Sequence, residues 1–283
     1  LYIVLSYKHG FHCGNHADVI KHITLCLLIR ALNQKEKPYT IIDTHSGSGL
    51  YKLDGFMAQK NQEFRSGVSK IENNQELKEL VPEFYEVLDY ARSNLPNSYP
   101  GSPMFETYLS REQDKITLID LHPNEFENLR NNFKRDHRLN IQCRDGLEAI
   151  NALLPPPIRR GLVFIDPAYE EKNEYIQLVK AVKTALHKWN TATIAVWYPV
   201  LGKMRDHSKN LTNDLRRLNV PLLQVELCVE PQEDVFGMCG SGMLVLNYPY
   251  NLDKELSPVV DLLYKNLAKK GGSARLKVLN AQA

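Results

Sequence analysis

The sequence contains few cysteines, and they form no recognisable pattern. The five cysteines among its 283 residues are scattered and odd in number, and no Cys-x-x-Cys pair occurs. A small secreted domain held together by disulfides has an even number of cysteines at regular spacing. The sequence therefore excludes a disulfide framework and predicts a reducing, cytoplasmic location.

Long apolar runs and a strong charge of either sign are also absent. No run approaches the roughly 20 residues of a membrane-spanning helix, and the apolar residues 1–5 are too few for a signal peptide. We therefore expect no membrane partner. The net charge is +2 and the isoelectric point about 8.2. A nucleic-acid partner is thus permitted but not required, and any basic surface must be local.

The chain does contain strand-like segments that alternate with helical ones. Helical spacing of apolar residues begins after Asn15, a candidate N-cap, and helical patterns occupy 15–33, 124–135, 146–154 and 173–189. Strand-like runs lie at 39–43, 115–120, 140–145, 161–166, 191–198, 222–229 and 242–248. This alternation predicts an α/β fold with a mostly parallel sheet of seven strands and helices on both faces.

The segment between the first two strands is far longer than a crossover requires. Residues 81–95 within it have a helical pattern. We therefore predict a small helical insertion over residues 52–98, within a single domain of residues 1–283. We expect the tail from residue 269 onward to be loosely ordered.

Four of the predicted strands end in aspartate, at Asp43, Asp120, Asp145 and Asp166. Parallel sheets bind ligands outside the carboxyl ends of their strands, where a carboxylate can accept hydrogen bonds from ribose hydroxyls. Gly47 and Gly49 would let the backbone approach a ligand closely. Together these features suggest an adenosine-containing ligand. Each aspartate alone is equally consistent with a helix N-cap, and the two glycines with a tight turn, since neither a Walker lysine nor a third glycine follows.

Residues 166–169, Asp-Pro-Ala-Tyr, follow a strongly apolar run. A carboxylate that accepts one N–H of an amine on a heteroaromatic ring, beside a backbone carbonyl that accepts the other, orients the nitrogen lone pair towards an electrophile. Pro167 would fix the turn that aims this carbonyl, and Tyr169 would give the base a stacking surface. The motif therefore predicts amine chemistry at Asp166. The alternative is a helix cap that follows a strand.

These features resemble the class I S-adenosylmethionine-dependent amino-methyltransferases, whose motif is typically Asp-Pro-Pro-Tyr; Ala168 departs from it. The chain is also similar to the RlmJ family, bacterial enzymes that methylate adenine N6 in 23S ribosomal RNA. This similarity rests on residues 6–22, 43–51, 99–103, 121–123, 159–170 and 197–200, and runs from about residue 6 to residue 250. It implies a Rossmann-like methyltransferase sheet, S-adenosylmethionine as cofactor and 23S ribosomal RNA as partner.

The resemblance also implies roles for individual residues. Asp166 would be catalytic, with Pro167 and Tyr169 beside it. The residues implied in cofactor binding are His22, His45, Gly47, Gly49, Ser102, Asp120, Asp145, Gly146 and Asp166. Ser102, at a helix start, would meet the methionine carboxylate. An N-terminal segment would fold over the site and engage the RNA through Tyr7, His9 and Lys21.

Three other functions stay open. DNA adenine methylation is one, although no separate target-recognition domain is evident. A nucleotide-dependent oxidoreductase would need the missing third glycine. Ala168 leaves room for a catalytically silent nucleic-acid-binding protein linked to the use of external DNA.

Two further expectations concern partners. The histidines and Cys13 within residues 9–22 could bind zinc, but their spacing matches no standard site, so we predict no metal. We expect a monomer or a weak dimer. Cations that could contact RNA phosphates, although solvated helix faces explain most of them equally well, are Lys52, Lys60, Arg65, Arg130, Lys134, Arg135, Arg138, Lys203, Arg205 and Lys209.

Overall fold

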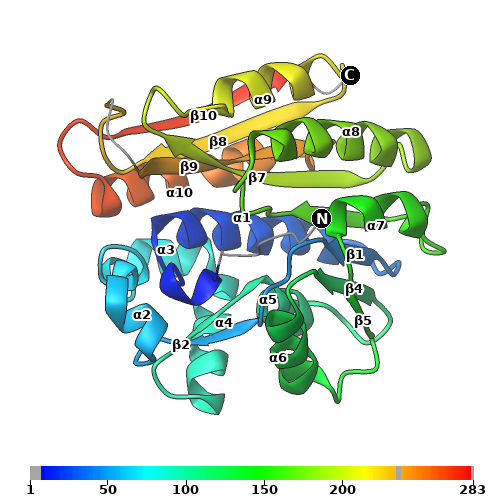
Figure 1. Cartoon of the computed structure of the whole chain (residues 1–283), viewed down its shortest axis with the longest axis horizontal. Coiled ribbons are helices and arrows are strands. Elements are labelled where there is room, and N and C mark those ends of the chain that lie inside the picture. Colours follow the sequence, from blue (N-terminus) through cyan, green and yellow to red (C-terminus); the bar gives the residue numbers. More distant parts are fainter. Residues whose placement is uncertain (1–7, 234–236, 282–283) are drawn as a thin grey trace.

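The computed structural model describes residues 8–233 and 237–281, and an eight-stranded sheet runs through this part of the chain (Figure 1). The strand order is β10-β8-β9-β7-β6-β1-β4-β5. The strands are β1 (Thr40–Asp43), β4 (Lys115–Asp120), β5 (Leu139–Cys143), β6 (Gly161–Ile165), β7 (Thr193–Leu201), β8 (Leu222–Cys228), β9 (Met238–Leu246) and β10 (Ser273–Asn280). From β5 to β7 neighbouring strands are parallel, whereas β9, β8 and β10 pair antiparallel.

The expectation of seven strands and a loosely ordered tail is wrong, because residues 273–280 form an eighth strand. β10 pairs with β8 and covers an edge whose backbone groups would otherwise lack strand partners. Leu276 packs against the core on one face of the sheet and Leu279 against the core on the other. Most other side chains of β10 are exposed, so the sequence lacks the apolar run that indicates a strand.

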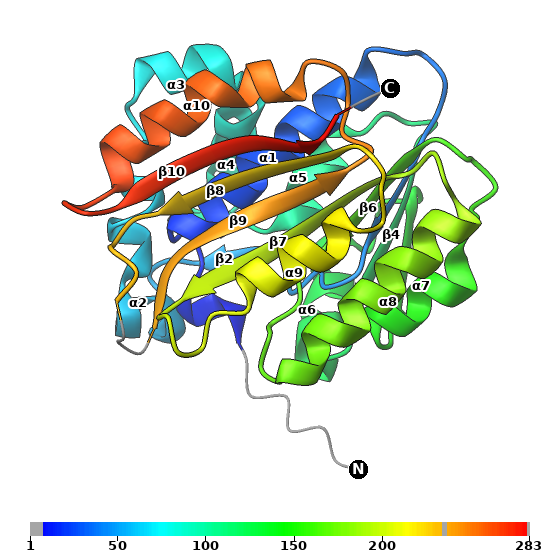
Figure 2. The ribbon, with the colours of Figure 1, turned by 90° about the horizontal axis from the view of Figure 1, so that it is seen from above.

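The sheet separates two apolar cores. The first face carries α1 (His16–Asn33), α5 (Ser102–Leu109), α6 (Pro123–Phe133) and α10 (Leu252–Leu267). The second carries α7 (Gly146–Leu153), α8 (Lys172–Lys188) and α9 (Ser208–Arg216). Figure 2 shows α8 and α9 on the side of the sheet opposite α1 and α10. The prediction of helices on both faces is therefore confirmed.

Helix α1 is buried on most sides, which is unusual for a helix that carries charged residues. Its N-cap is Asn15, as predicted, and the side chain of Asn15 accepts the backbone N–H groups of Ala17 and Asp18. Its buried residues include Asp18, Lys21 and His22. Buried charges require partners, so the contacts of these side chains determine what the helix can do.

The residues between β1 and β4 form a separate group of short elements. They are β2 (Leu50–Lys52), α2 (Phe56–Asn61), η2 (Glu63–Arg65), η3 (Val68–Lys70), α3 (Gln75–Leu80), α4 (Pro82–Asn94) and β3 (Ser98–Pro100). β2 and β3 are antiparallel, and Lys52 lies opposite Ser98. The segment 52–98 thus begins and ends at facing strand residues, while apolar side chains such as Val68 and Phe84 join the core around α1. In the described part of the chain, no helix has the length and apolarity needed to cross a bilayer.

Candidate active site

The carboxyl ends of β1, β4 and β6 lie side by side, because β1 pairs in parallel with both other strands. Asp43 ends β1, Asp120 ends β4 and Asp166 directly follows β6. Asp145 follows β5, the neighbour of β4. The structure therefore brings all four predicted aspartates to one edge of the sheet, where α/β folds bind their ligands.

The turn after β1 is held against β4 by its backbone. Gly47 N–H donates to Asp120 Oδ2 at 2.8 Å, and His122 N–H donates to Asp120 Oδ1 at 2.8 Å. Gly47 and Gly49 have φ values of 59° and 73°, which favour glycine. A Cβ at Gly47 would lie 2.1 Å from Tyr51 Oη. Both glycines are therefore required for this turn, whether or not a ligand is bound.

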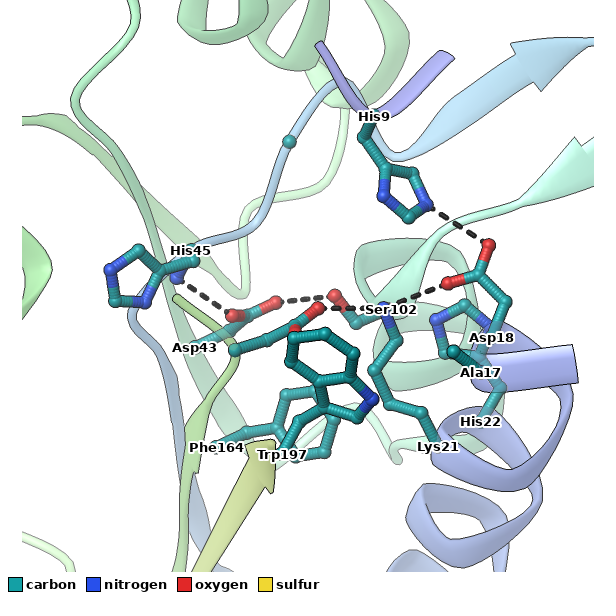
Figure 3. Close-up of polar contacts among 12 residues, drawn as sticks. His9, Ala17, Asp18, Lys21, His22, Asp43, His45, Ser102, Phe164 and Trp197 are labelled. Carbon is teal, nitrogen blue, oxygen red and sulfur yellow. Dashed lines mark hydrogen bonds and ion pairs between the residues drawn. The ribbon is translucent and has the colours of Figure 1, made fainter. Parts of the chain in front are cut away.

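Asp43 is fully buried beneath this turn. Its Oδ2 accepts the Ser102 hydroxyl at 2.7 Å, and its Oδ1 accepts the His45 N–H at 3.1 Å (Figure 3). Burial raises the pKa of Asp43 to about 7, although these hydrogen bonds oppose it. Ser102, predicted to meet a cofactor carboxylate, points its hydroxyl at Asp43 here.

The predicted adenine residues serve the start of α7. Asp145 accepts a hydrogen bond from the N–H of Glu148 at 2.9 Å. It is therefore the N-cap of α7, the alternative that the sequence left open. A Cβ at Gly146 would lie 2.0 Å from the carbonyl oxygen of Thr44. Gly146 thus lets α7 approach the turn after β1 closely. His45 lies in that turn, and burial lowers the pKa of its ring.

Asp166 ends a chain of side-chain contacts that begins at His9. His9 Nε2 lies 3.0 Å from Asp18 Oδ2, Asp18 Oδ1 lies 2.8 Å from Lys21 Nζ, and Lys21 Nζ lies 2.6 Å from Asp166 Oδ2. Figure 3 shows His9, Asp18 and Lys21 joined by dashed lines beside α1. The structure therefore unites the predicted catalytic residue with two of the three residues assigned to RNA, and Tyr7 lies outside the described residues.

Aromatic rings pack around Tyr169, three residues after Asp166. Tyr169 has a φ of 53°, a conformation that is rare outside glycine and found at functional sites. Its hydroxyl donates to the carbonyl oxygen of Trp197 at 2.6 Å, and its ring lies 4.4 Å from that of Tyr175. The Lys21 ammonium lies 5.9 Å from the Trp197 ring. Tyr169 is thus anchored in place rather than mobile over the site.

His22 is buried among aromatic rings instead of lining the sheet edge. Its Nδ1 lies 2.8 Å from the Tyr99 hydroxyl, and its ring stacks on Phe105 at 4.8 Å. Burial holds the pKa of His22 well below its usual range. Within residues 8–233 and 237–281, no three histidine, cysteine or acidic side chains are grouped as metal ligands.

Sequence reasoning missed two residues of this site, Asp18 and Trp197. Asp18 lies three positions before Lys21 on α1, a spacing that places both on one helix face. Trp197 lies on β7, the strand next to β6. Ile165 pairs with Val196, so Asp166 and Trp197 are the next residues of the two chain segments. Both signals could have been read once the parallel sheet was predicted.

A family model described as "Ribosomal RNA large subunit methyltransferase D, RlmJ" matches residues 36–279. The chain belongs to this family. The RlmJ relatives include two proteins named "Ribosomal RNA large subunit methyltransferase J". The one from Haemophilus influenzae is 39% identical over 95% of this chain and 96% of its own length. The one from Escherichia coli K12 is 38% identical, with the same shares of each chain.

One solved structure has the same fold as this chain. Protein LPL1258 from Legionella pneumophila is 34% identical, with a TM-score of 0.85 over 94% of this chain and 97% of that chain. The fold is thus the Rossmann-like α/β fold of a methyltransferase, as predicted, and the chain is an enzyme of the methyltransferase class.

Proposed function

We propose that the chain transfers a methyl group from S-adenosylmethionine to the N6 amine of an adenine in 23S ribosomal RNA. The position of Asp166 carries this proposal. Its Oδ2 bonds Lys21, and among the described residues none donates a hydrogen bond to Oδ1. A carboxylate oxygen with an open lone pair is the acceptor that an exocyclic N–H needs.

The same edge of the sheet fits the cofactor. Each oxygen of Asp120 accepts one backbone N–H and keeps a lone pair for a ribose hydroxyl. Gly47 and Gly49 expose backbone that no side chain covers. His45 and Ser102 are held next to this turn because both donate hydrogen bonds to Asp43. Asp145 and Gly146 begin the neighbouring helix, beside the adenine position that we assign. When bound, S-adenosylmethionine supplies an electrophilic methyl group.

Residues of the chain would orient the target amine. Asp166 Oδ1 accepts one N–H and the Pro167 carbonyl accepts the other, so that the nitrogen lone pair faces the methyl group. Tyr169 and Trp197 form an aromatic wall against which the base can stack. The methylated nitrogen carries one proton too many, and Asp166 is placed to take it. The adenine must be unpaired or flipped out of a helix to reach this position.

The choice of substrate rests on the relatives, which are named ribosomal RNA large subunit methyltransferases. We infer that His9 and Lys21 organise the site on the RNA side, and that residues 52–98 form an insertion that docks the RNA. Ribosomal RNA as substrate corresponds to a cytoplasmic enzyme. We expect it to act as a monomer or a weak dimer.

A labelling experiment tests the proposal. The chain is incubated with methyl-tritiated S-adenosylmethionine and a 23S RNA transcript, duplex DNA of the same sequence, or no nucleic acid, and the nucleosides are then separated. We expect tritium in N6-methyladenosine from RNA alone. Label in DNA alone would favour a DNA methyltransferase. RNA binding without any label, at saturating cofactor, would favour a silent binding protein.

A further inference from the structure

Lys21 bridges two carboxylates in the interior of the protein. Its Nζ lies 2.6 Å from Asp166 Oδ2 and 2.8 Å from Asp18 Oδ1, and its side chain is 5% exposed. Burial lowers the pKa of Lys21, but the two carboxylates outweigh burial and hold the pKa well above its usual range. The lysine is therefore a cation at neutral pH.

Asp18 is fixed through both of its oxygens. Besides Lys21 at Oδ1, the Gly14 N–H donates to Oδ2 at 2.8 Å and His9 Nε2 lies 3.0 Å from Oδ2. Burial raises the pKa of Asp18, but His9 and Lys21 hold it well below its usual range. Asp18 is thus ionised. It is only 1% exposed, so a ligand at the sheet edge cannot reach it, and the proposed reaction so far assigns it no role.

We infer that Asp18 is a positioning residue that shares the Lys21 cation with Asp166 and thereby leaves Asp166 able to act on the adenine amine. The inference rests on the proposed function. Asp18 touches neither substrate. Asp18 acts only through Lys21.

A lysine cation bonded to Asp166 alone would oppose the reaction in two ways. It would weaken the carboxylate as an acceptor, because part of its charge would be neutralised. It would also repel the positive charge that the amine nitrogen gains on methylation, in a site where little water screens the interaction. Asp18 offsets both effects because its own charge lies 2.8 Å from the same ammonium.

Other titratable groups near Asp166 do not supply this compensation. Asp43 has a pKa of about 7 and is therefore only partly ionised at neutral pH. Burial lowers the pKa of His45 and raises that of Tyr169 well above its usual range, so both are neutral. Asp18 is thus the ionised acid that balances Lys21 in this part of the described structure.

Asp18→Asn tests the inference, because it keeps the size of the side chain and an acceptor for Gly14 N–H while it removes the charge. With 23S RNA as substrate, we expect kcat to fall about tenfold or more, and KM for S-adenosylmethionine to change less than about twofold. The acid limb of the kcat–pH profile should move to lower pH by about one unit, because an uncompensated cation favours the ionised form of the base.

Asp114→Asn is the matched control. Asp114 is also fully buried and accepts hydrogen bonds from Tyr39 N–H and from Arg111, but it precedes β4 at the opposite edge of the sheet. It should lose stability without changing kcat or the pH profile. If Asp18→Asn does not fold, Asp18→Ser keeps an oxygen for Gly14 and should give the same two shifts.

The outcomes separate this inference from the function on which it rests. A wild-type kcat and an unmoved acid limb in the folded Asp18 variant would overturn the role of Asp18, while wild-type methylation of RNA still stands. Failure of the wild-type protein to methylate RNA under the same conditions would overturn the proposed function itself.

Discussion

Carboxyl groups at one edge of the sheet differ in charge because their surroundings differ. Burial raises the pKa of both Asp43 and Asp120, while hydrogen bonds oppose the rise. Glu106 lies one turn after Ser102 on α5, and both of its oxygens are buried with no partner among the described residues. Burial holds the pKa of Glu106 well above its usual range, so it is neutral. The ion pair between Asp18 and Lys21 therefore lies near buried carboxyl groups whose pKa is raised.

The pKa of Asp43 predicts how stability depends on pH. Its pKa is about 7 in the folded protein, whereas its usual value, which applies to the unfolded chain, is 3.8. Folding therefore favours the protonated form. The resulting stabilisation is full below about pH 4 and is lost as the pH rises through 7. Asp43→Asn lacks this dependence. Between pH 5 and pH 8, its free energy of unfolding should therefore improve relative to wild type by about 2–3 kcal/mol, at roughly 1.4 kcal/mol per pKa unit.

Urea denaturation without cofactor, at a series of pH values, measures this difference. Because the comparison is between variant and wild type, other titrating groups cancel to first order. A difference that does not change with pH would show that Asp43 is ionised in the folded protein.

Asp120 should control cofactor affinity. A charge-assisted hydrogen bond contributes roughly 1.5–3 kcal/mol, so Asp120→Ala should raise the Kd for S-adenosylmethionine about 10- to 100-fold. Calorimetry measures the Kd directly. Glu112→Ala, which removes an exposed acid before the other end of β4, should leave it unchanged. An unchanged Kd in the Asp120 variant would remove this carboxylate from the cofactor site.

At the scale of elements, the sequence predicted what is determined locally. The helices α1, α6, α7 and α8 lie within two residues of the predicted bounds, because apolar spacing and the caps Asn15 and Asp145 are local signals. The aspartates at the strand ends lie close together because the strands are parallel, and this topology was predicted from the sequence. The partner of Asp166 could not be predicted, because Lys21 is 145 positions away and only the packing of α1 brings it near.

Gly67 should link the insertion to the active site. A Cβ there would lie 2.2 Å from the Gly14 carbonyl oxygen and 2.6 Å from the Asn15 carbonyl carbon, where α1 begins. Gly67→Ala must therefore displace the helix that carries Asp18 and Lys21. We expect a Tm several degrees lower and a kcat reduced about tenfold or more.

Gly55→Ala is the control within the same insertion. Its Cβ would lie 3.2 Å from the Lys52 carbonyl oxygen, a small clash that the loop can relieve. Tm and kcat should stay close to wild type. Equal effects of the two substitutions would show that the contact at Gly67 is not specific.

Residues 52–98, which we propose as an insertion, also present exposed cations. Reversing the charge of Lys52, Lys60 and Arg65 together should weaken RNA binding and flatten its dependence on salt, since fewer counterions are released. Reversing Lys35, Lys37 and Lys115, which are equally exposed at the amino edge of the sheet, is the control. Filter binding at several salt concentrations measures both effects. If the two triple variants behave alike, the RNA docks elsewhere, and residues 130–138 become the next candidate.

At the scale of the whole molecule, α1 joins the parts that the proposed reaction needs. It packs against β9, α5, α10 and α4, and it lies between the sheet and the insertion (Figure 1). Its first turns hold Lys21 against Asp166 at the sheet edge. The RNA-docking surface that we propose on residues 52–98 is therefore only one helix away from Asp166.

The central claim is that Asp166 accepts a hydrogen bond, and then a proton, from the adenine amine at the carboxyl edge of the sheet. The single-turnover rate of methyl transfer to 23S RNA by Asp166→Asn tests it most directly, because asparagine keeps the size of the side chain but cannot take a proton. The account predicts a rate at least about 10²-fold below wild type, with the Kd for S-adenosylmethionine within about tenfold. A wild-type rate, or a loss of rate fully explained by lost cofactor binding, would contradict it.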